Sequence, residues 1–429
     1  RPGALFFNQN TYNTIVSAHG IMMIVATIVM IAGPVGNFVV PIMIGARDMA
    51  FPRLNALSFW LLFLDVPVIL TTLFLGGFTT GWFGYAPIAD QGLTTGQLSY
   101  DFFIIIFAIS TTIAAMNIMT TVLVMRTTGM TWGRLPITVW GVFLSVALSL
   151  MAFPFFMMVQ IMVVLDRVYQ TSFFLAASGG SNFLYEQLFW FFGHPEVYVI
   201  VLPALAVAAE IAVVFARKPA FGYRLIVASM LGISILSALV WGHHLYTSGS
   251  QGPLNIPFML DTELISIPTG VFFLALIGTF WRGKLWVTVP ILFVCAVLVN
   301  FVIGGITGIY LADLPTDELL HGGMFVTAHF HFTLVGAGVF GFFASFYYWW
   351  PKMIGKRLDP LLGQLHFWLF EIGFLGTFLS LFIAGLQGEP RWSANIPAPF
   401  VPANTVASLF AILIAASVFV AIFNVIYTL

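Results

Sequence analysis

Long apolar runs recur along the whole chain, separated by short stretches that hold most of its polar residues. Each run has about twenty residues or more, the length that an α-helix needs to cross a bilayer. We expect eleven spans, near residues 15–44, 56–78, 102–125, 137–163, 186–214, 224–247, 258–280, 287–311, 322–350, 365–386 and 403–428. Because only helices and closed barrels satisfy their backbone in lipid, the pattern predicts an all-α polytopic membrane protein with a single transmembrane domain over residues 1–429.

Lys and Arg residues fall mainly in alternate loops between these spans. Cytoplasmic loops carry the excess of positive charge, so we predict that the amino terminus lies outside and the carboxyl terminus inside. Twelve of the fifteen basic residues then lie inside: Arg47, Arg53, Arg126, Arg134, Arg217, Lys218, Arg224, Arg282, Lys284, Lys352, Lys356 and Arg357. Arg1, Arg167 and Arg391 lie outside. We expect further sequence upstream of Arg1, because the first ten residues are typical of the middle of a loop.

The composition excludes several classes of protein. Charged residues make up 7% of the chain and hydrophobic residues 60%, whereas a soluble domain carries about 25% charged residues. A net charge of -1 argues against nucleic acid as a partner. The single cysteine, Cys295, excludes both a disulfide framework and a paired-cysteine metal site.

Histidines concentrate at one depth of the predicted membrane. Seven of the eight lie at or within the outer half of a span: His19, His194, His243, His244, His321, His329 and His331. His366 starts the tenth span on the inner side, where we interpret it as an interfacial histidine bonded to a carbonyl. Ionisable groups inside a membrane are costly and usually face a cavity or a cofactor. Imidazole is a suitable ligand for copper, iron and zinc. So many histidines at the same membrane depth therefore predict more than one metal centre.

Two of these histidines, His329 and His331, are separated by one residue in a single span. On an α-helix such positions lie roughly 200° apart, so the two rings face opposite ways and cannot bind the same metal. His331 could meet His19 across a flat macrocycle as the two axial ligands of a haem, and His329 could bind a second haem from one side. His194, His243 and His244 would form a three-nitrogen site with an open position, as catalytic metal sites have.

Further polar residues predict proton chemistry. Tyr198 lies four residues after His194, one turn away on the same helix face, where a phenol could supply a proton and an electron. Glu196 is a carboxyl deep in the same span, which suits a group that passes protons onward. Asp48 at the inner surface, with Asn37, Asn55 and Asn117, would complete a proton line from the inner side, although a single Asn is more often a helix-packing residue.

The segments SAHG, GARDMAFPRLN, WFFGHPEVY, WGHHLYTSG and AHFHF resemble the signature stretches of subunit I of haem–copper oxygen reductases, and HPEVY resembles the A-type branch. The resemblance runs from about Phe7 to Leu429. It implies a bundle of twelve helices whose first helix precedes this sequence. It also implies the reduction of dioxygen to water, coupled to proton pumping.

Transferred to this chain, the resemblance implies that His19 and His331 ligate a low-spin haem and His329 a high-spin haem, with a-type haems expected. His194, His243 and His244 would bind copper, and Tyr198 would be joined covalently to His194. Asp48, Asn37, Asn55, Asn117 and Glu196 match the D-type proton pathway. Trp82 and Arg391 are further candidates for contact with the haems, Arg391 through a propionate.

The chain departs from the family pattern at three places. Phe272 follows the IPTGV stretch where the family's second proton pathway has a lysine nearby; Thr269 remains, and Glu210 is a candidate substitute. His321 is followed by Gly322 rather than by the Asp of the family's outer magnesium site. Arg391 is followed by Trp392 where the family has a second arginine.

The predicted partners are a copper-bearing subunit II, a subunit III, cytochrome c or a similar donor, dioxygen and membrane lipids, in a prokaryotic cell membrane or the mitochondrial inner membrane. A quinol oxidase is the nearest alternative, although Thr11 and Thr14 stand where quinol-contacting residues are expected. A nitric oxide reductase would lack the HPEVY tyrosine. A haem-free transporter with histidine proton relays is the alternative from a different class.

Overall fold

The structure is a computed structural model that describes residues 8–91, 94–249 and 251–429, and it is helical over these residues, with no β-strand. Within these described ranges, eleven helical segments are long and apolar enough to cross a membrane: Gln9–Ile44, Pro52–Thr71, Gly96–Val124, Ile137–Tyr169, Asn182–Ala216, Tyr223–Leu245, Gly252–Phe280, Val289–Ala312, Met324–Ile354, Pro360–Leu386 and Ala398–Thr428. The predicted fold class is confirmed. The second span ends at Thr71 rather than near residue 78, because the chain turns at Gly76 and Gly77, which have positive φ angles of 86° and 74°.

The chain divides into two compact units. Of the described residues, unit 2 comprises 8–200 and Ile233–Thr262, and unit 1 comprises Val201–Gly232 and Glu263–Leu429. The helices α7 (Asn182–Ala216), α8 (Tyr223–Ser237) and α9 (Asn255–Leu264) each contribute residues to both units. The expectation of a single catalytic domain stays a prediction.

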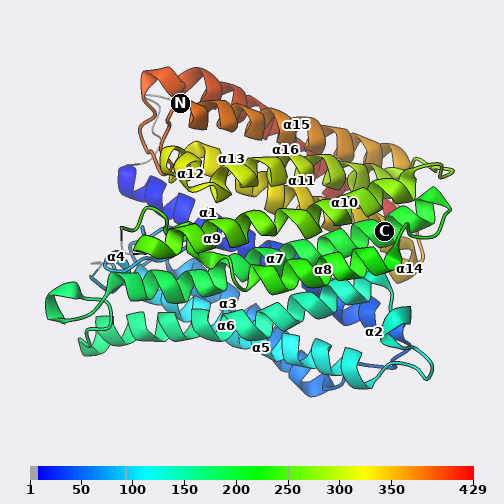
Figure 1. The fold of residues 1–429 in the computed structure, drawn as a ribbon, viewed down its shortest axis with the longest axis horizontal. Helices are drawn as coiled ribbons and strands as arrows, with labels where there is room; N and C mark the ends of the chain where they lie inside the picture. Colours follow the sequence, from blue (N-terminus) through cyan, green and yellow to red (C-terminus); the bar gives the residue numbers. More distant parts are fainter. Residues whose placement is uncertain (1–7, 92–93, 250) are drawn as a thin grey trace. The chain divides into compact units, whose positions relative to one another are not determined.

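Unit 2 is built around long helices whose facing sides are aromatic. Its further elements are α1 (Gln9–Ile31), a π-helix η1 (Ala32–Val39), α2 (Val40–Ile44), α3 (Pro52–Thr71), α4 (Ile88–Gln91), α5 (Gly96–Val124), η2 (Trp132–Arg134), α6 (Ile137–Tyr169), η3 (Ala176–Ser178), η4 (Trp241–Leu245) and η5 (Gly252–Leu254). The α5 helix packs against α3 and α6 (Figure 1). Phe156 of α6 stacks on Phe192 of α7 at a centroid distance of 4.0 Å, so this interface is closed by aromatic packing.

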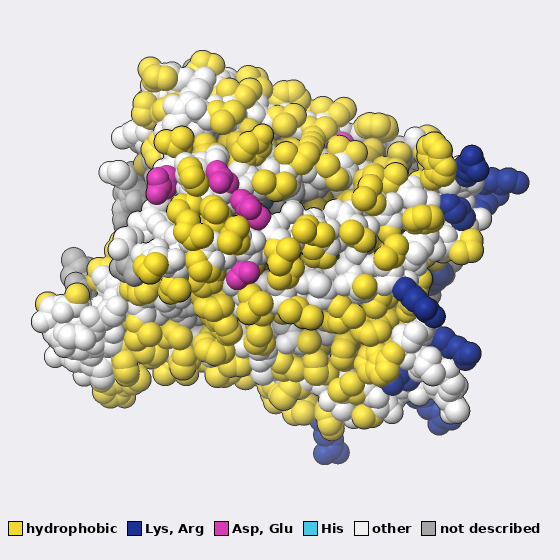
Figure 2. Space-filling view, viewed as in Figure 1, with side chains coloured by type: hydrophobic (Ala, Val, Ile, Leu, Met, Phe, Trp, Pro, Cys, Tyr) yellow, Lys and Arg dark blue, Asp and Glu magenta, His cyan; other side chains and the backbone are white. Residues whose placement is uncertain are grey.

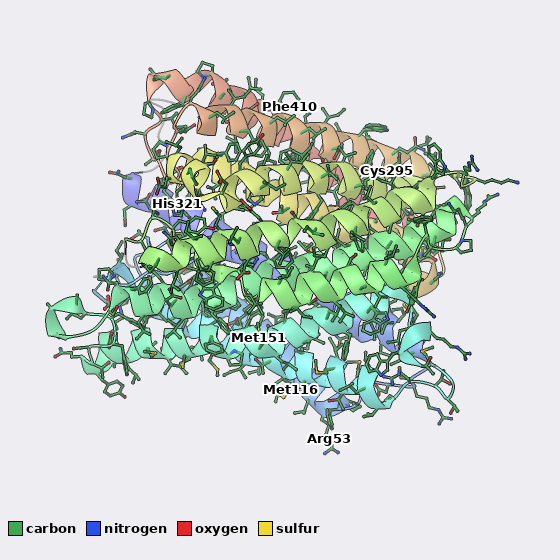
Figure 3. The ribbon with its side chains drawn as sticks, viewed as in Figure 1. Arg53, Met116, Met151, Cys295, His321 and Phe410 are labelled. Carbon is green, nitrogen blue, oxygen red and sulfur yellow. The ribbon has the colours of Figure 1, made fainter. Side chains whose placement is uncertain are left out.

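Unit 1 contains the remaining long helices. Its further elements are α10 (Ser266–Phe280), α11 (Val289–Ala312), α12 (Leu314–Leu320), α13 (Met324–Phe330), a π-helix η6 (His331–Val339), α14 (Phe340–Ile354), α15 (Pro360–Leu386), η7 (Ala398–Phe400) and α16 (Val401–Thr428). The α15 and α16 helices lie side by side (Figure 1). A Cβ on Gly376 of α15 would lie 2.1 Å from the ring of Phe410 on α16, labelled in Figure 3, so the close approach of these helices requires glycine.

The outer surfaces of the helices are apolar, as a protein in lipid requires. Figure 2 shows hydrophobic side chains along the helix flanks and Lys and Arg side chains at helix ends. Phe74 is 84% exposed, and Arg53 is an exposed residue whose side chain projects away from the helices (Figure 3). Cys295 lies on α11 as a free thiol, as the sequence predicts.

Candidate functional site

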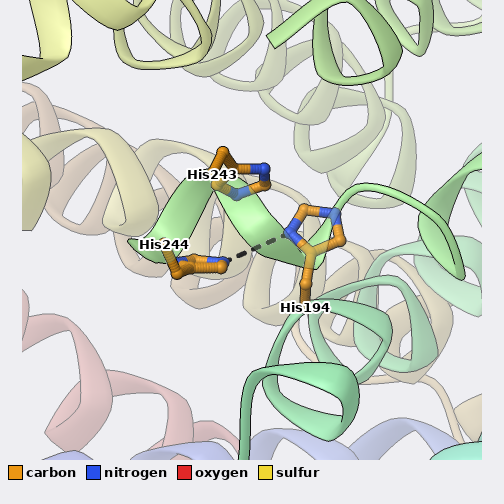
Figure 4. A group of neighbouring side chains, drawn as sticks. All are labelled: His194, His243 and His244. Carbon is orange, nitrogen blue, oxygen red and sulfur yellow. Dashed lines mark hydrogen bonds between the residues drawn. The ribbon is translucent and has the colours of Figure 1, made fainter. Parts of the chain in front are cut away.

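Three histidines of unit 2 come together in space although 50 residues of chain separate the first from the last. His194 lies on α7, and His243 and His244 lie on the short helix η4 (Figure 4). One ring nitrogen from each lies within 4.8 Å of those of the other two, and His194 Nδ1 is 3.3 Å from His244 Nε2. His194 is buried and the other two are half-buried. This cluster is the only such group of three or more ligating side chains that the described residues contain.

Neighbouring side chains fix two of these rings. Trp190, one turn before His194 on α7, stacks on His244 at a centroid distance of 3.6 Å and an interplanar angle of 7°. Thr262 Oγ1 lies 3.1 Å from His243 Nδ1, and the same hydroxyl donates its hydrogen to Phe258 O at 2.5 Å. The hydroxyl therefore accepts a hydrogen bond from His243 Nδ1, which leaves the lone pair on Nε2. A metal-ligating histidine uses its second nitrogen in this way.

Tyr198 and Glu196 follow His194 on α7. The rings of His194 and Tyr198 have centroids 5.0 Å apart and are tilted by 53°. Glu196 is 3% exposed and so lies inside unit 2. The one-turn spacing thus places a phenol beside the three-histidine cluster and a carboxyl within the same buried helix.

His329 and His331 of unit 1 lie where the helix changes geometry, at the end of α13 and the first residue of the π-helix η6. His329 Nδ1 lies 3.0 Å from Gly304 O, and His331 Nδ1 lies 2.7 Å from Thr327 O. A carbonyl can only accept, so each Nδ1 carries the hydrogen and each Nε2 presents a lone pair. Both rings are therefore in the tautomer that a metal bound through Nε2 requires.

His19 and Trp82 belong to one neighbourhood of unit 2. A Cβ on Gly20, the residue after His19, would lie 2.9 Å from Trp82 Cβ. The Trp82 ring meets the Trp190 ring edge to face, at 5.9 Å and 88°. Trp82 thus links the segment that carries His19 with the tryptophan that stacks on His244, a connection that the sequence does not show.

Arg391 and His321 are loop-adjacent residues of unit 1. Arg391 donates its backbone N–H to Gly322 O at 2.9 Å, and its guanidinium lies 5.3 Å from the centroid of Phe330, which stacks on His331 at 4.4 Å. His321 Nδ1 lies 2.8 Å from Asp317 Oδ2. Burial raises the pKa of Asp317, and the contact with His321 opposes this shift. Sequence reasoning missed Asp317, although its position four residues before His321 on a helix was the available signal.

The inner polar residues of unit 2 have mainly backbone partners. Asn117 Oδ1 accepts from Phe51 N at 2.8 Å and its Nδ2 donates to Phe51 O at 3.3 Å, so this side chain holds the loop after α2 against α5. Asp48 Oδ1 accepts from Met49 N at 2.7 Å, and Asn37 Nδ2 donates to Gly33 O at 3.1 Å. Asn55 lies on the first turn of α3, where its carbonyl accepts from the hydroxyl of Ser58.

The residues expected near a second proton pathway lie on two helices. Phe272 is fully buried in α10, and Thr269 Oγ1 of the same helix donates to Ile265 O at 2.8 Å. Glu210 is half-buried on the part of α7 that belongs to unit 1. His366 is not the interfacial residue that we expected. It is fully buried, its Nδ1 lies 3.0 Å from the Tyr347 hydroxyl, and it sits six residues inside α15 because that helix already begins at Pro360.

Known proteins similar to this chain are oxidases. A family model described as Cytochrome C and Quinol oxidase polypeptide I matches residues 1–413. A putative cytochrome c oxidase subunit 1-beta of Streptomyces coelicolor is 41% identical, over 99% of this chain and 75% of that protein. Cytochrome c oxidase subunit 1 of Thermostichus vulcanus is 38% identical, over 99% of this chain and 77% of that protein. Quinol oxidase subunit 1 of Bacillus subtilis is 40% identical, over 91% of this chain and 61% of that protein.

The fold also matches a solved structure. A heme-copper terminal oxidase dimer studied by cryo-EM superposes with a TM-score of 0.83 at 18% sequence identity, covering 99% of this chain and 78% of that one. At this identity the likeness supports the fold alone. The family match extends over nearly all of the sequence. It argues against the alternative interpretation of the polar residues, a haem-free transporter with histidine proton relays. The chain therefore belongs to the family of polypeptide I of cytochrome c and quinol oxidases, which are haem–copper terminal oxidases that work with other oxidase subunits.

Proposed function

We propose that this chain is the catalytic subunit of a proton-pumping oxidase that reduces dioxygen to water at a haem–copper centre. The observation that carries the proposal is the cluster of His194, His243 and His244, in which Thr262 sets His243 for ligation through Nε2. Three imidazoles with no thiolate or carboxylate among them suit copper. Haem and copper, when bound, supply the electron transfer to dioxygen that these side chains cannot perform.

The histidines of α13 and η6 are the proposed haem ligands in unit 1. His329 would ligate the high-spin haem and His331 the low-spin haem, for which His19 of unit 2 is the proposed second ligand. The Nδ1 hydrogen bonds to Gly304 O and Thr327 O support this assignment, because they leave Nε2 of both rings available. We assign two haems of a-type, with Trp82 and Arg391 as haem contacts.

The proton chemistry is assigned to the side chains around α7 and to the inner loops. Tyr198 would provide a proton from its hydroxyl next to the copper ligands, and it would be joined covalently to His194. Glu196 would hold and pass on a proton inside the membrane. Asp48 would take up protons at the inner surface, with Asn37, Asn55 and Asn117 along the route and Thr269 and Glu210 on a second one. From the positive-inside rule we infer that the metal centres would lie in the outer half of the membrane.

Electrons would enter from cytochrome c or a similar donor through a copper-bearing subunit II, with subunit III as a further partner. The quinol oxidase of Bacillus subtilis is about as similar as the cytochrome c oxidases, so quinol oxidation is the second candidate. A magnesium-type site at His321 would have to use Asp317, which contacts it, because the next residue is Gly322.

The test is a pyridine-haemochrome spectrum with metal analysis on the assembled complex. We expect two haems and one copper per chain, and the haem type follows from the band positions. A carefully purified complex without haem absorbance would end the proposal. Oxygen consumption with reduced cytochrome c and with a quinol as separate donors then decides between the two candidates. Pumping is measured in proteoliposomes, by comparing the rise in pH on the side from which the oxidase takes up protons with the fall in pH on the other side.

A further inference from the structure

A carboxyl and an amide to which the proposed function gives no role form a hydrogen bond inside the membrane spans of unit 1. Asn300 of α11 donates from Nδ2 to Glu371 Oε2 of α15 at 3.0 Å. Asn300 is fully buried and Glu371 is 8% exposed. Among the described residues of unit 1, Glu371 is the one carboxyl in a membrane span that is buried to this degree. A buried ionisable residue in a membrane span is costly and usually functional.

The backbone of the π-helix η6 makes room for this pair. A Cβ on Gly336 of η6 would lie 2.8 Å from Asn300 Cβ and 3.7 Å from the ring of Phe374, so a larger residue there would displace the amide. Asn300 and Glu371 therefore lie among α11, η6 and α15. His331 is the first residue of η6, and Phe378 of α15 stacks on it.

The pair has the chemistry of a site that can both hold and release a proton. An amide offers a donor and an acceptor, whereas an ionised carboxylate only accepts and a carboxylic acid does both. Asn300 Nδ2 already donates to Glu371, and Asn300 Oδ1 is buried with no hydrogen-bond partner among the described residues. When Glu371 is protonated, it can accept a hydrogen bond from Asn300 Nδ2 and donate one to Asn300 Oδ1. When Glu371 is ionised, it can only accept, so the bond from Nδ2 alone remains.

The pair is close enough to His331 to respond to a charge there. Glu371, Phe374 and Phe378 follow one face of α15 at spacings of three and four residues, and Phe378 stacks on His331 at 4.2 Å. Seven residues of helix place Glu371 about 10 Å along α15 from Phe378, the ring that stacks on His331. At a separation of roughly 10–15 Å and an effective dielectric of about 20, one added charge changes the proton affinity of a carboxyl by roughly tenfold.

We propose that Asn300 and Glu371 form a redox-linked proton site of unit 1. When an electron reaches the group bound by His331, a carboxylate oxygen of Glu371 binds a proton from water, forming one O–H bond. When that electron passes on to dioxygen, the O–H bond breaks and the proton returns to water. The donor supplies the electron, so no further reactant is needed. This inference rests on the proposed function, because it requires a redox group at His331.

The test is the infrared difference spectrum of the oxidase, reduced minus oxidised, in the C=O stretching region of carboxylic acids. We expect a band that Glu371→Gln removes and that Asn300→Leu shifts, because the C=O frequency depends on the hydrogen bonds of the acid. Glu318→Gln, which removes an exposed carboxyl of the same unit, should leave the band unchanged. Anaerobic reduction with a pH-indicator dye should show less proton uptake in Glu371→Gln, by up to a single proton per chain.

The outcomes separate this inference from the proposed function. Wild-type protein without haem would refute the proposed function itself. Wild-type protein with haem but without a redox-linked carboxyl band, or a band that survives Glu371→Gln, would show that the pair is only a helix-packing hydrogen bond. If Glu371→Gln does not assemble, Asn300→Leu decides the matter, since an unshifted band in that variant overturns the assignment. The double change to leucine, which removes both buried polar groups together, should keep the haem spectrum and lose the band.

Discussion

Replacing Thr262 by valine tests whether a hydroxyl prepares His243 for copper. Valine has nearly the shape of threonine but cannot accept the hydrogen bond from His243 Nδ1, which lies 3.1 Å from Thr262 Oγ1. The ring would lose the partner that keeps the hydrogen on Nδ1 and the lone pair on Nε2. Loss of such an outer partner lowers metal affinity by about 10- to 100-fold, which corresponds to roughly 1.4–2.7 kcal/mol.

The measurement is copper content against haem content as a chelator is titrated into the purified oxidase. We expect Thr262→Val to lose copper at about 10- to 100-fold lower chelator concentration than the wild type, with the haem content unchanged. Thr262→Ser keeps the hydroxyl and should behave as wild type. Thr120→Val is a matched control, because among the described residues Thr120 Oγ1 bonds just the carbonyl of Met116 on its own helix.

Unchanged copper retention in Thr262→Val would refute the reasoning, because it would mean that the hydroxyl does not set the ring for ligation. A variant that lost haem and copper together would also contradict it, since the hydroxyl contacts only the copper side of the site. Loss in Thr262→Ser equal to that in Thr262→Val would show that packing of the methyl group matters rather than the hydrogen bond.

Two further predictions concern stability. Burial raises the pKa of Glu389 above its ordinary value of 4.5, and the hydrogen bond from Asn404 opposes this shift. The contribution of this carboxyl to the free energy of unfolding is therefore complete below pH 4.5, and it is lost as the pH rises through the raised pKa. Glu389→Gln cannot ionise, so its melting temperature in detergent should fall less than that of the wild type above this pH. Glu318→Gln changes an exposed carboxyl and should follow the wild type. Parallel curves of melting temperature against pH for Glu389→Gln and wild type would contradict the prediction. Gly376→Ala should lower the free energy of unfolding by about 1–3 kcal/mol, because the new Cβ would overlap the ring of Phe410. At Gly305 no atom lies within 4 Å of a new Cβ, so Gly305→Ala should melt as the wild type or slightly higher. Equal melting temperatures for the two variants would disprove the close packing of α15 and α16.

The hydrophobic pattern predicted the membrane spans well because lipid imposes a single requirement on every spanning segment. Each needs enough apolar residues in sequence and internal backbone hydrogen bonds, and both properties are local. Errors arose where the decisive interaction was a turn or a distant contact. The second span ends at Thr71 because of two glycines in left-handed conformations, and His366 is covered by Tyr347 of another helix.

The structure brings together three of the predicted site residues, and it adds contacts that no spacing rule contains. His194, His243 and His244 follow from motifs, and their nitrogens do approach within 4.8 Å. The stacking of Trp190 on His244 and the contact of Trp82 with the residue after His19 join segments far apart in sequence. Such contacts depend on how helices pack, so hydropathy and helical periodicity carry no information about them.

The least predictable property is also the one that makes these histidines usable as ligands. A sequence shows where an imidazole lies but not which of its nitrogens carries the hydrogen, and only a nitrogen with a free lone pair can bind a metal. For His329 this choice is made by the carbonyl of Gly304, 25 residues earlier on another helix, and for His243 by the hydroxyl of Thr262. For His331 it is made by Thr327 O, one turn away on the same helix. Three rings in unrelated local structures thus share one pattern, with Nδ1 held by an acceptor and Nε2 presented. His321, which is outside the proposed haem and copper ligands, shows the same pattern with Asp317 Oδ2, so the tautomer makes a ring usable but does not select the ligands. The selection rests on position, above all on the approach of the nitrogens of His194, His243 and His244 to within 4.8 Å of one another.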